Sequence, residues 1–418
     1  MPRLTRDRIT WLTYAQLGLW GFFLYGFGPV VPLLRDEQGT SAAVAGLHST
    51  GIAVGALAGG ALFAPLARRV GRGGAVWTGL AGVALGVTAL GALRALPATI
   101  TAVAVIATFG MLVISGVSVV LTDRHGTGAP AALTEANAAC AGMGILAPLV
   151  IGTSVDAGWG WRPVMAVEAG LIALVALAAV TFRVRLPRAA PAAAAGDPPA
   201  GEPADTGPPA GARRAAPVAG AARRLPPTYW IAWVLMAVTG SIEVCLSLWT
   251  ADVLRSHAGM AAGAASAAVA AIVCGMFVGR LVGGRFALRY RPVPLLLAAL
   301  GVSLAGFALF WVAPVGWLAV AGLVVLGLGN ALHYPLAISI ALAVAGPAAD
   351  RAAGWASYSM GVGFGIAPVA LGWVADGVGP HLAFLLLPGF IAAAALLTAR
   401  LGRALHPAPD EVRTPAPA

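Results

Sequence analysis

The sequence contains no lysine, only three cysteines and few charged residues. All 26 basic side chains are arginines, and charged residues make up 10% of the 418. Without lysine there is no P-loop nucleotide-binding motif, which excludes an ATP-driven pump of that type. Cys140, Cys245 and Cys274 show no paired spacing. Neither a disulfide framework nor a metal site is therefore expected.

Hydrophobic residues are abundant, at 59% of the chain, which is more than a soluble protein of this length buries. Uncharged apolar runs of about 20 residues or more recur along the sequence, and each can cross roughly 30 Å of hydrocarbon. They predict an all-α membrane protein with twelve transmembrane helices. The expected helices are 9–34, 41–67, 73–96, 98–122, 134–155, 161–182, 228–254, 260–288, 292–313, 316–345, 351–374 and 380–400.

The arginines are unevenly distributed between the apolar runs. Every second connection, together with both ends of the chain, holds 21 of the 26. The other connections hold only Arg35, Arg94, Arg162 and Arg255, and Arg280 lies inside an apolar run. Because cytoplasmic loops of membrane proteins are enriched in basic residues, we expect a multi-pass protein of the inner (plasma) membrane with both termini in the cytoplasm. The net charge of +10 then needs no nucleic-acid partner.

Residues 183–227 differ from the rest of the chain because they hold ten of its 30 prolines and show no apolar periodicity. Such a segment predicts a disordered cytoplasmic linker. It divides the chain into an N-terminal six-helix half (1–182) and a C-terminal six-helix half (228–400), followed by a tail (401–418).

The two halves share patterns of small residues. Glycines four residues apart in the second run recur 224 residues later in the eighth: Gly51, Gly55 and Gly59 match Gly275, Gly279 and Gly283. An Ala-Pro pair, a glycine and an aspartate around the fifth run recur 220 residues later in the eleventh. These repeats predict two pseudo-symmetric six-helix bundles. The glycine stripes are expected where helices pack closely, on the seam where the two halves rock.

The connection after the second run carries a recognisable motif. Ala64-Pro-Leu-Ala-Arg68-Arg69-Val70-Gly71-Arg72-Gly73 resembles Gly-x-x-x-Asp-Arg-x-Gly-Arg-Arg, the loop motif of the major facilitator superfamily. Arg69, Gly71 and Arg72 match, but Arg68 stands in place of the aspartate. The resemblance extends over residues 9–400 and implies a transporter rather than an enzyme. It also suggests that Arg69, Arg72 and Asp123 contribute to an inner gate.

Three segments are similar to the fucose-permease-like branch of that superfamily, whose known members are mostly proton-coupled sugar transporters. The segments are Ser241-Ile-Glu243, Gly279-Arg-Leu-Val-Gly-Gly-Arg285 and Gly327-Leu-Gly-Asn-Ala-Leu-His-Tyr-Pro335. A proton-antiport exporter of drugs or metabolites is the alternative, although Ala147-Pro148 replaces the Gly-Pro of the exporter motif. An integral-membrane transferase is a minor alternative, since the outer connections are short for a catalytic site.

Glu243 is the best candidate for proton coupling. A carboxylate inside a membrane helix is costly unless it faces protein or water, and only Glu168 and Glu243 lie well inside the predicted helices. We expect Glu243 to bind and release a proton as access alternates, and no cofactor besides that proton. Glu168 remains open between a structural and a functional role.

Polar and aromatic residues at similar depths predict a cavity for a small-molecule substrate. The candidates are Gln16, Tyr25, Trp249, Asn330, His333 and Tyr358. Asn330, His333 and Tyr334 are spaced to share one helix face. Arg280 is counted as an inner-gate or anchoring residue, because it lies about 19 residues from the outer end of its helix. It can snorkel toward the cytoplasm or pair with an inner carboxylate such as Asp123, Glu135 or Asp350, and contact with an anionic substrate is the alternative. We expect the chain to act as a monomer in the bilayer.

Overall fold

The computed structural model describes residues 6–126, 129–184, 186, 225–287, 289–313, 315–346 and 349–405. Throughout these ranges the regular secondary structure is helical. The helices are α1 (Arg8–Gln38), α2 (Ala42–Ala92), α3 (Leu96–His125), α4 (Ala129–Asp156), α5 (Arg162–Thr181), α6 (Pro227–Ser256), α7 (Ala262–Ala268), α8 (Ala270–Ala287), α9 (Pro292–Val312), α10 (Gly316–Asn330), α11 (His333–Ala345), α12 (Ala349–Val378), α13 (Pro380–Ala383) and α14 (Leu386–Leu405).

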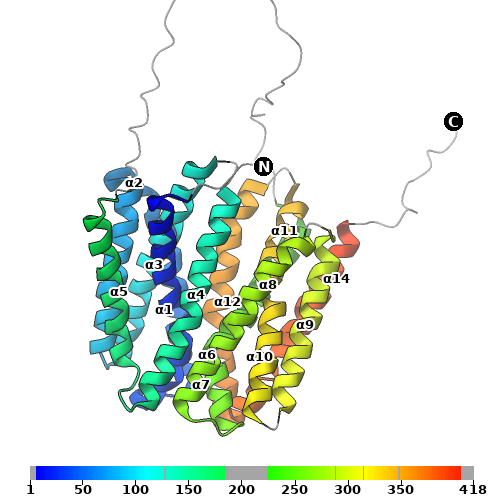
Figure 1. Ribbon diagram of the computed structural model, residues 1–418. Helices are drawn as coiled ribbons and strands as arrows, with labels where there is room; N and C mark the ends of the chain where they lie inside the picture. The colour runs from blue at the N-terminus through cyan, green and yellow to red at the C-terminus, as the bar shows by residue number, and fades with distance from the viewer. Residues whose placement is uncertain are drawn as a thin grey trace, which may run out of the picture.

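The helices stand roughly parallel, and α1 begins at the same end of the bundle at which α14 finishes (Figure 1). We call this the termini end, and the other the opposite end. Helices α1–α5 form the N-terminal half and α6–α14 the C-terminal half. Residues 187–224 of the predicted linker and 406–418 of the tail lie outside the described residues.

The described chain contains 11 helical spans long and apolar enough to cross a membrane. One of them, α2, has 51 residues and would be roughly 77 Å long if straight, far more than one crossing needs. Its backbone breaks at Gly71, where φ is 79° and ψ is 165°. Glycine tolerates this positive φ because it has no Cβ. Counted as two arms, α2 completes the twelve predicted crossings of a multi-span membrane protein.

Side chains at the helix ends explain several boundaries. The Asp7 carboxylate accepts a hydrogen bond from the Thr10 backbone amide at 2.9 Å, and Ser41 caps α2 in the same way. Gly39 ends α1 with a left-handed φ of 61°. These are the residue types that favour helix starts and stops.

Several predicted helices are divided in the structure. Residues 260–288 form α7 and α8, 316–345 form α10 and α11, and 380–400 lie in α13 and α14. The break in 316–345 falls at Ala331–Leu332, directly between Asn330 and His333. A hydropathy pattern cannot detect such a break, because both sides of it are equally apolar.

The internal repeat is present, but its offset is 220 throughout. α2 begins at Ala42 and α7 at Ala262, and α3 begins at Leu96 and α10 at Gly316. The predicted offset of 224 for the glycines of α2 and α8 is therefore wrong by one helical turn. Because glycines recur every four residues in both stripes, the sequence matches itself almost as well one turn out of register.

The glycine stripes also lie on a different surface from the one expected. Gly51, Gly55 and Gly59 pack α2 against α3, and Gly275, Gly279 and Gly283 pack α8 against α10 and the turn after it. Both contacts are within one half, so the prediction that these glycines form the seam between the halves is wrong. They instead let helices of the same half approach closely, as small residues do in membranes.

Other small residues bring the two halves together. The halves meet where α1 packs on α6, α2 on α12, and α4 on α7 and α8. A Cβ added at Gly28 would strike Ser247, and one at Gly152 would strike Gly263. Both close approaches lie in the part of the bundle nearer the opposite end, as the helix bounds show.

Candidate functional site

Three polar side chains from three helices meet between the two halves. The guanidinium of Arg280 in α8 lies close enough to interact electrostatically with the phenol of Tyr25 in α1 and with Glu243 of α6. Cys140 of α4 lies close enough to interact with the same guanidinium. Each of Tyr25, Glu243 and Arg280 is partly exposed, so the cluster is not sealed inside the protein.

The depth of these residues explains why they meet. Tyr25 lies about 13 residues before the end of α1 at Gln38 and Glu243 about 13 before the end of α6 at Ser256, so both are roughly 20 Å from the opposite end. Arg280 lies about 18 residues beyond Ala262, at the start of α7, roughly 27 Å from that end. The cluster is therefore near the middle of the membrane.

Side-chain direction closes the remaining gap in depth. Side chains lean toward the N-terminus of their own helix. Tyr25 and Glu243 consequently lean toward the termini end, because α1 and α6 start there. Arg280 leans the other way, because α8 runs in the opposite direction. The long arginine side chain thus reaches the level of the phenol and the carboxyl group.

The predicted ion partners of Arg280 are wrong in two cases. Asp123 pairs with Arg72, and Glu135 pairs with Arg6. The side chain of Asp350, the third candidate, lies outside the described residues. We predicted that Arg280 lies near the termini end because we counted depth at its backbone position. Its guanidinium instead reaches Tyr25 and Glu243 in the middle of the bundle.

Asn330 and His333 do not share a face. The Asn330 amide nitrogen lies 3.7 Å from the sulfur of Met276 in α8, whereas Nε2 of His333 lies 3.1 Å from the hydroxyl of Ser303 in α9. Both residues are buried. The break between α10 and α11 turns them toward different neighbours. Tyr334, the residue after His333, does interact electrostatically with Glu243. We had not predicted it as a residue of the cavity.

The other predicted cavity residues have separate surroundings. Gln16 is fully buried, and neither of its amide atoms has a hydrogen-bond partner among the described residues. Trp249 is buried and donates its indole N–H to the carbonyl of Pro368 in α12 at 3.2 Å. Tyr358 is 52% exposed and packs beside Trp355. Of the six predicted cavity residues, the structure brings only Tyr25 to Glu243 and Arg280.

The residues predicted for the inner gate lie at the termini end. Arg72 forms an ion pair with Asp123, which joins the second arm of α2 to α3. Arg69 is exposed. The Arg72–Asp123 pair links helices of the N-terminal half, and its contribution to gating stays a prediction.

The opposite end carries an ion-pair network that we did not predict. Arg35, in the last turns of α1, contacts both Asp36 and Asp252, and the Arg35–Asp252 distance is 2.6 Å. Arg255 contacts Asp36 across the same boundary at 2.8 Å. One feature of the sequence hinted at this network, since a basic and an acidic residue recur near the ends of the first and seventh runs.

A second set of contacts at the opposite end joins α2 to α12. The carboxylate of Asp376 accepts hydrogen bonds from the backbone amides of Ala42 and Ala43 at 2.7 and 2.9 Å. A carboxylate is favourable at this position, because the first amides of a helix are unpaired and carry partial positive charge. Ser49 and Thr50 add hydrogen bonds to carbonyls of Phe364 and Gly365.

Glu168 is separate from all of these groups. It is fully buried in α5, and neither carboxylate oxygen has a hydrogen-bond partner among the described residues. A buried ionised carboxylate without a partner is very costly. We therefore expect Glu168 to be protonated in this conformation.

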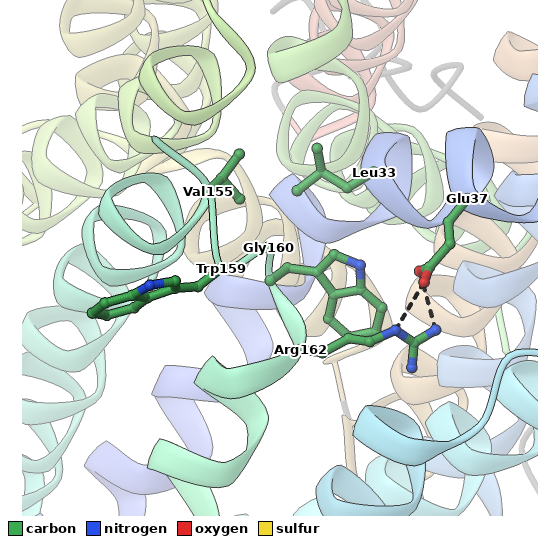
Figure 2. Close-up of a pocket in the computed structure, with 7 residues that line it drawn as sticks. Leu33, Glu37, Val155, Trp159, Gly160 and Arg162 are labelled. Carbon is green, nitrogen blue, oxygen red and sulfur yellow. Dashed lines mark hydrogen bonds and ion pairs between the residues drawn. The ribbon is translucent and has the colours of Figure 1, made fainter. Parts of the chain in front are cut away.

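A small pocket lies elsewhere, between the end of α1 and the loop before α5. Figure 2 shows Arg162 reaching Glu37. The Arg162 nitrogens Nε and Nη2 lie 2.9 and 3.0 Å from the two carboxylate oxygens of Glu37. The other lining residues include Leu33, Val155 and Trp159. All of these belong to the N-terminal half, so this pocket does not lie between the halves. Within the described chain, no group of three or more His, Cys, Asp or Glu side chains could hold a metal ion.

Comparison with known proteins gives the family. The family model described as the major facilitator superfamily matches residues 17–349 and 253–417. The chain belongs to the major facilitator superfamily. No curated protein matches the sequence, so membership of the fucose-permease-like branch stays a prediction. The family and the solved structures below are transporters, and the chain has their fold.

Three solved structures illustrate that similarity. A bacterial homologue of the human lysosomal transporter Spinster, inward-facing and unoccupied, has a TM-score of 0.72 at 15% identity, with 95% of this chain and 97% of that chain covered. A nucleoside transporter has a TM-score of 0.73 at 14% identity, covering 94% and 98%. A D-xylose–proton symporter has a TM-score of 0.69 at 14% identity, covering 94% and 96%.

Proposed function

We propose that this chain is a secondary active transporter that carries a small polar metabolite, such as a sugar, together with a proton by alternating access. It acts as a monomer and not as an enzyme. The observation that carries the proposal is the position of Glu243. This carboxyl group is partly exposed at mid-depth between the two halves, next to Arg280 and Tyr25. Transporters of this architecture bind substrate and coupling ion there.

The arrangement of contacts between the halves supports alternating access. Hydrogen bonds and ion pairs join the halves at the opposite end, through Arg35, Asp252 and Asp376. At the termini end, the described ion pairs Arg6–Glu135, Arg124–Asp7 and Arg72–Asp123 lie within the N-terminal half. We infer a conformation that is closed at the opposite end. The similar Spinster homologue is described as inward-facing and unoccupied.

The distribution of arginines supports an orientation. The connections at the termini end hold most of the basic residues, which favours the cytoplasm for that end. The opposite end then faces outward from the inner (plasma) membrane, and the structure corresponds to an inward-facing state. A proton moving down a potential of 100 mV releases about 2.3 kcal/mol, which suffices for roughly 50-fold accumulation of a neutral substrate.

The nature of the site favours a polar substrate over a lipophilic cation. The fixed positive charge of Arg280 would repel a cationic drug held beside Glu243. A sugar hydroxyl, in contrast, can bond to the phenol, the guanidinium or the carboxyl group. The structural neighbours include a D-xylose–proton symporter and nucleoside transporters. An exporter of drugs or metabolites by proton antiport remains the alternative.

A thermal-shift screen followed by a transport assay tests this function. The purified chain is screened against neutral sugars, nucleosides and lipophilic cations, since a ligand at about 100 times its Kd adds roughly 2.7 kcal/mol of stability. The ligand found is then used with proteoliposomes. Glu243→Gln is expected to abolish uptake driven by a pH gradient while sparing exchange of labelled for unlabelled substrate. Continued accumulation in this variant would refute coupling through Glu243, and stabilisation by cations alone would favour the exporter.

A further inference from the structure

The guanidinium of Arg280 has few partners among the described residues for its N–H donors and its charge. None of the ion pairs within 4 Å between described residues includes Arg280, and the groups near enough to interact with it electrostatically include the Tyr25 phenol and the Glu243 carboxyl group. A guanidinium has five N–H donors and does not lose its charge in proteins. In a membrane, such a charge is costly unless something pairs with it. When Glu243 is protonated, the charge of Arg280 has no anionic partner among these neighbours.

The charges around Arg280 define what that anion can be. The neighbouring titratable groups are Tyr25 of α1, Cys140 of α4, Glu243 of α6 and, beside Glu243, Tyr334 of α11. A phenol and a thiol are ordinarily neutral at physiological pH. With Glu243 ionised, the site has no net charge. With Glu243 protonated, it carries one positive charge, which one monoanion cancels.

We propose that Arg280 and the Tyr25 phenol bind the carboxylate of a small monocarboxylate substrate, such as a sugar acid, which enters together with the proton on Glu243. This inference rests on the proposed function and names its substrate class. A carboxylate matches the fork of a guanidinium in two parallel hydrogen bonds. Tyr25 belongs to the N-terminal half and Arg280 to the C-terminal half, so the substrate would bridge the two bodies that rock.

Other substrate charges fit less well. A neutral sugar leaves the positive charge of Arg280 unpaired when Glu243 is protonated. A phosphate monoester, which carries nearly two negative charges at pH 7, leaves negative charge uncompensated in the middle of the membrane. One proton and one monocarboxylate together cross without net charge, so the loaded site is electrically balanced.

Thermal-shift binding with matched ligands tests the proposal. D-gluconate and D-glucuronate are compared with D-glucose and D-glucose 6-phosphate at about pH 5.5 and pH 8, where sugar acids remain ionised. The sugar acids are expected to stabilise the wild-type chain, and more at the lower pH, because protonation of Glu243 frees Arg280. Arg280→Gln is expected to weaken the binding of sugar acids at least tenfold. Arg280→Lys keeps the positive charge but lacks the paired N–H donors of a guanidinium, so it is expected to weaken binding by a smaller factor.

Two controls make the test decisive. Arg94→Gln removes an exposed arginine within the N-terminal half and should leave binding unchanged, and the melting temperature without ligand shows that each variant folds. Glu243→Gln mimics the protonated acid and should bind sugar acids equally at both pH values. The proposal is overturned if no sugar acid binds, if D-glucose or D-glucose 6-phosphate binds instead, or if Arg280→Gln binds like wild type. Proton-driven uptake of a neutral sugar that needs Glu243 but not Arg280 would overturn this proposal and leave the proposed function standing.

Discussion

At the scale of single residues, Asp252 is one of the side chains that join the two halves at the opposite end. Its side chain is only 5% exposed and holds Arg35 from the other half at 2.6 Å. Removing one partner from a buried ion pair leaves the other charge uncompensated, although Arg35 keeps its exposed partner Asp36. We expect Asp252→Asn to shift the equilibrium away from the closed state by about 1–2 kcal/mol, a factor of roughly 5–30.

Thiol labelling measures that shift. The three native cysteines are replaced by alanine, and a cysteine is placed at Ser247, which lies against Gly28 between the halves. A membrane-impermeant maleimide added from the opposite-end side should label this cysteine several-fold faster in Asp252→Asn. Arg94→Gln is the matched control, because its ion pair with Glu37 is exposed and lies within one half. Equal labelling in Asp252→Asn and wild type would show that this pair does not hold the closure.

At the scale of helices, the glycine contacts predict symmetrical effects of mutation. A Cβ at Gly55 would collide with the backbone of Ala104, and one at the equivalent Gly275 with Val324. We expect Gly55→Ala and Gly275→Ala each to lower the stability of its own half by about 1–3 kcal/mol, the usual range for overpacking. Gly60, on the same arm of α2, has open space around it.

Thermal melting of the purified variants in detergent checks this prediction. Gly60→Ala should change stability by no more than about 1 kcal/mol, since only helix propensity is altered. Gly55→Ala and Gly275→Ala should melt at clearly lower temperatures than both Gly60→Ala and wild type. Similar melting of all three variants would mean that α2–α3 and α8–α10 can separate without cost.

At the scale of the whole molecule, a crosslink between the halves should stop transport. A Cβ built on Gly365 of α12 lies 3.5 Å from the Cβ of Ala53 in α2, within the range of about 3.5–4.5 Å found in disulfides. In the cysteine-free background, the double variant Ala53→Cys/Gly365→Cys is expected to lose transport on oxidation and regain it on reduction. The two single variants should be insensitive to oxidant. Full transport by the crosslinked protein would contradict rocking of the two halves.

Some features of the fold could be predicted from the sequence, and others could not. The crossings, the six-plus-six division and the superfamily were predictable, because length, hydropathy and the Arg69–Gly71–Arg72 motif are local properties. The register of the repeat was not, because glycines every four residues fit at 220 and at 224 alike. The surroundings of Asn330 and His333 were missed because the helix breaks between them.

The sequence by itself determined that this chain crosses the membrane many times, since apolar runs of this length and number have no other stable environment. It also pointed to Glu243, because a carboxyl group inside such a run is rare and costly. Only the tertiary structure decided which side chains surround Arg280. Its partners Tyr25 and Glu243 come from helices remote in sequence, and they meet because antiparallel helices direct their side chains toward one another. That convergence depends on how the helices pack, which a one-dimensional pattern does not contain.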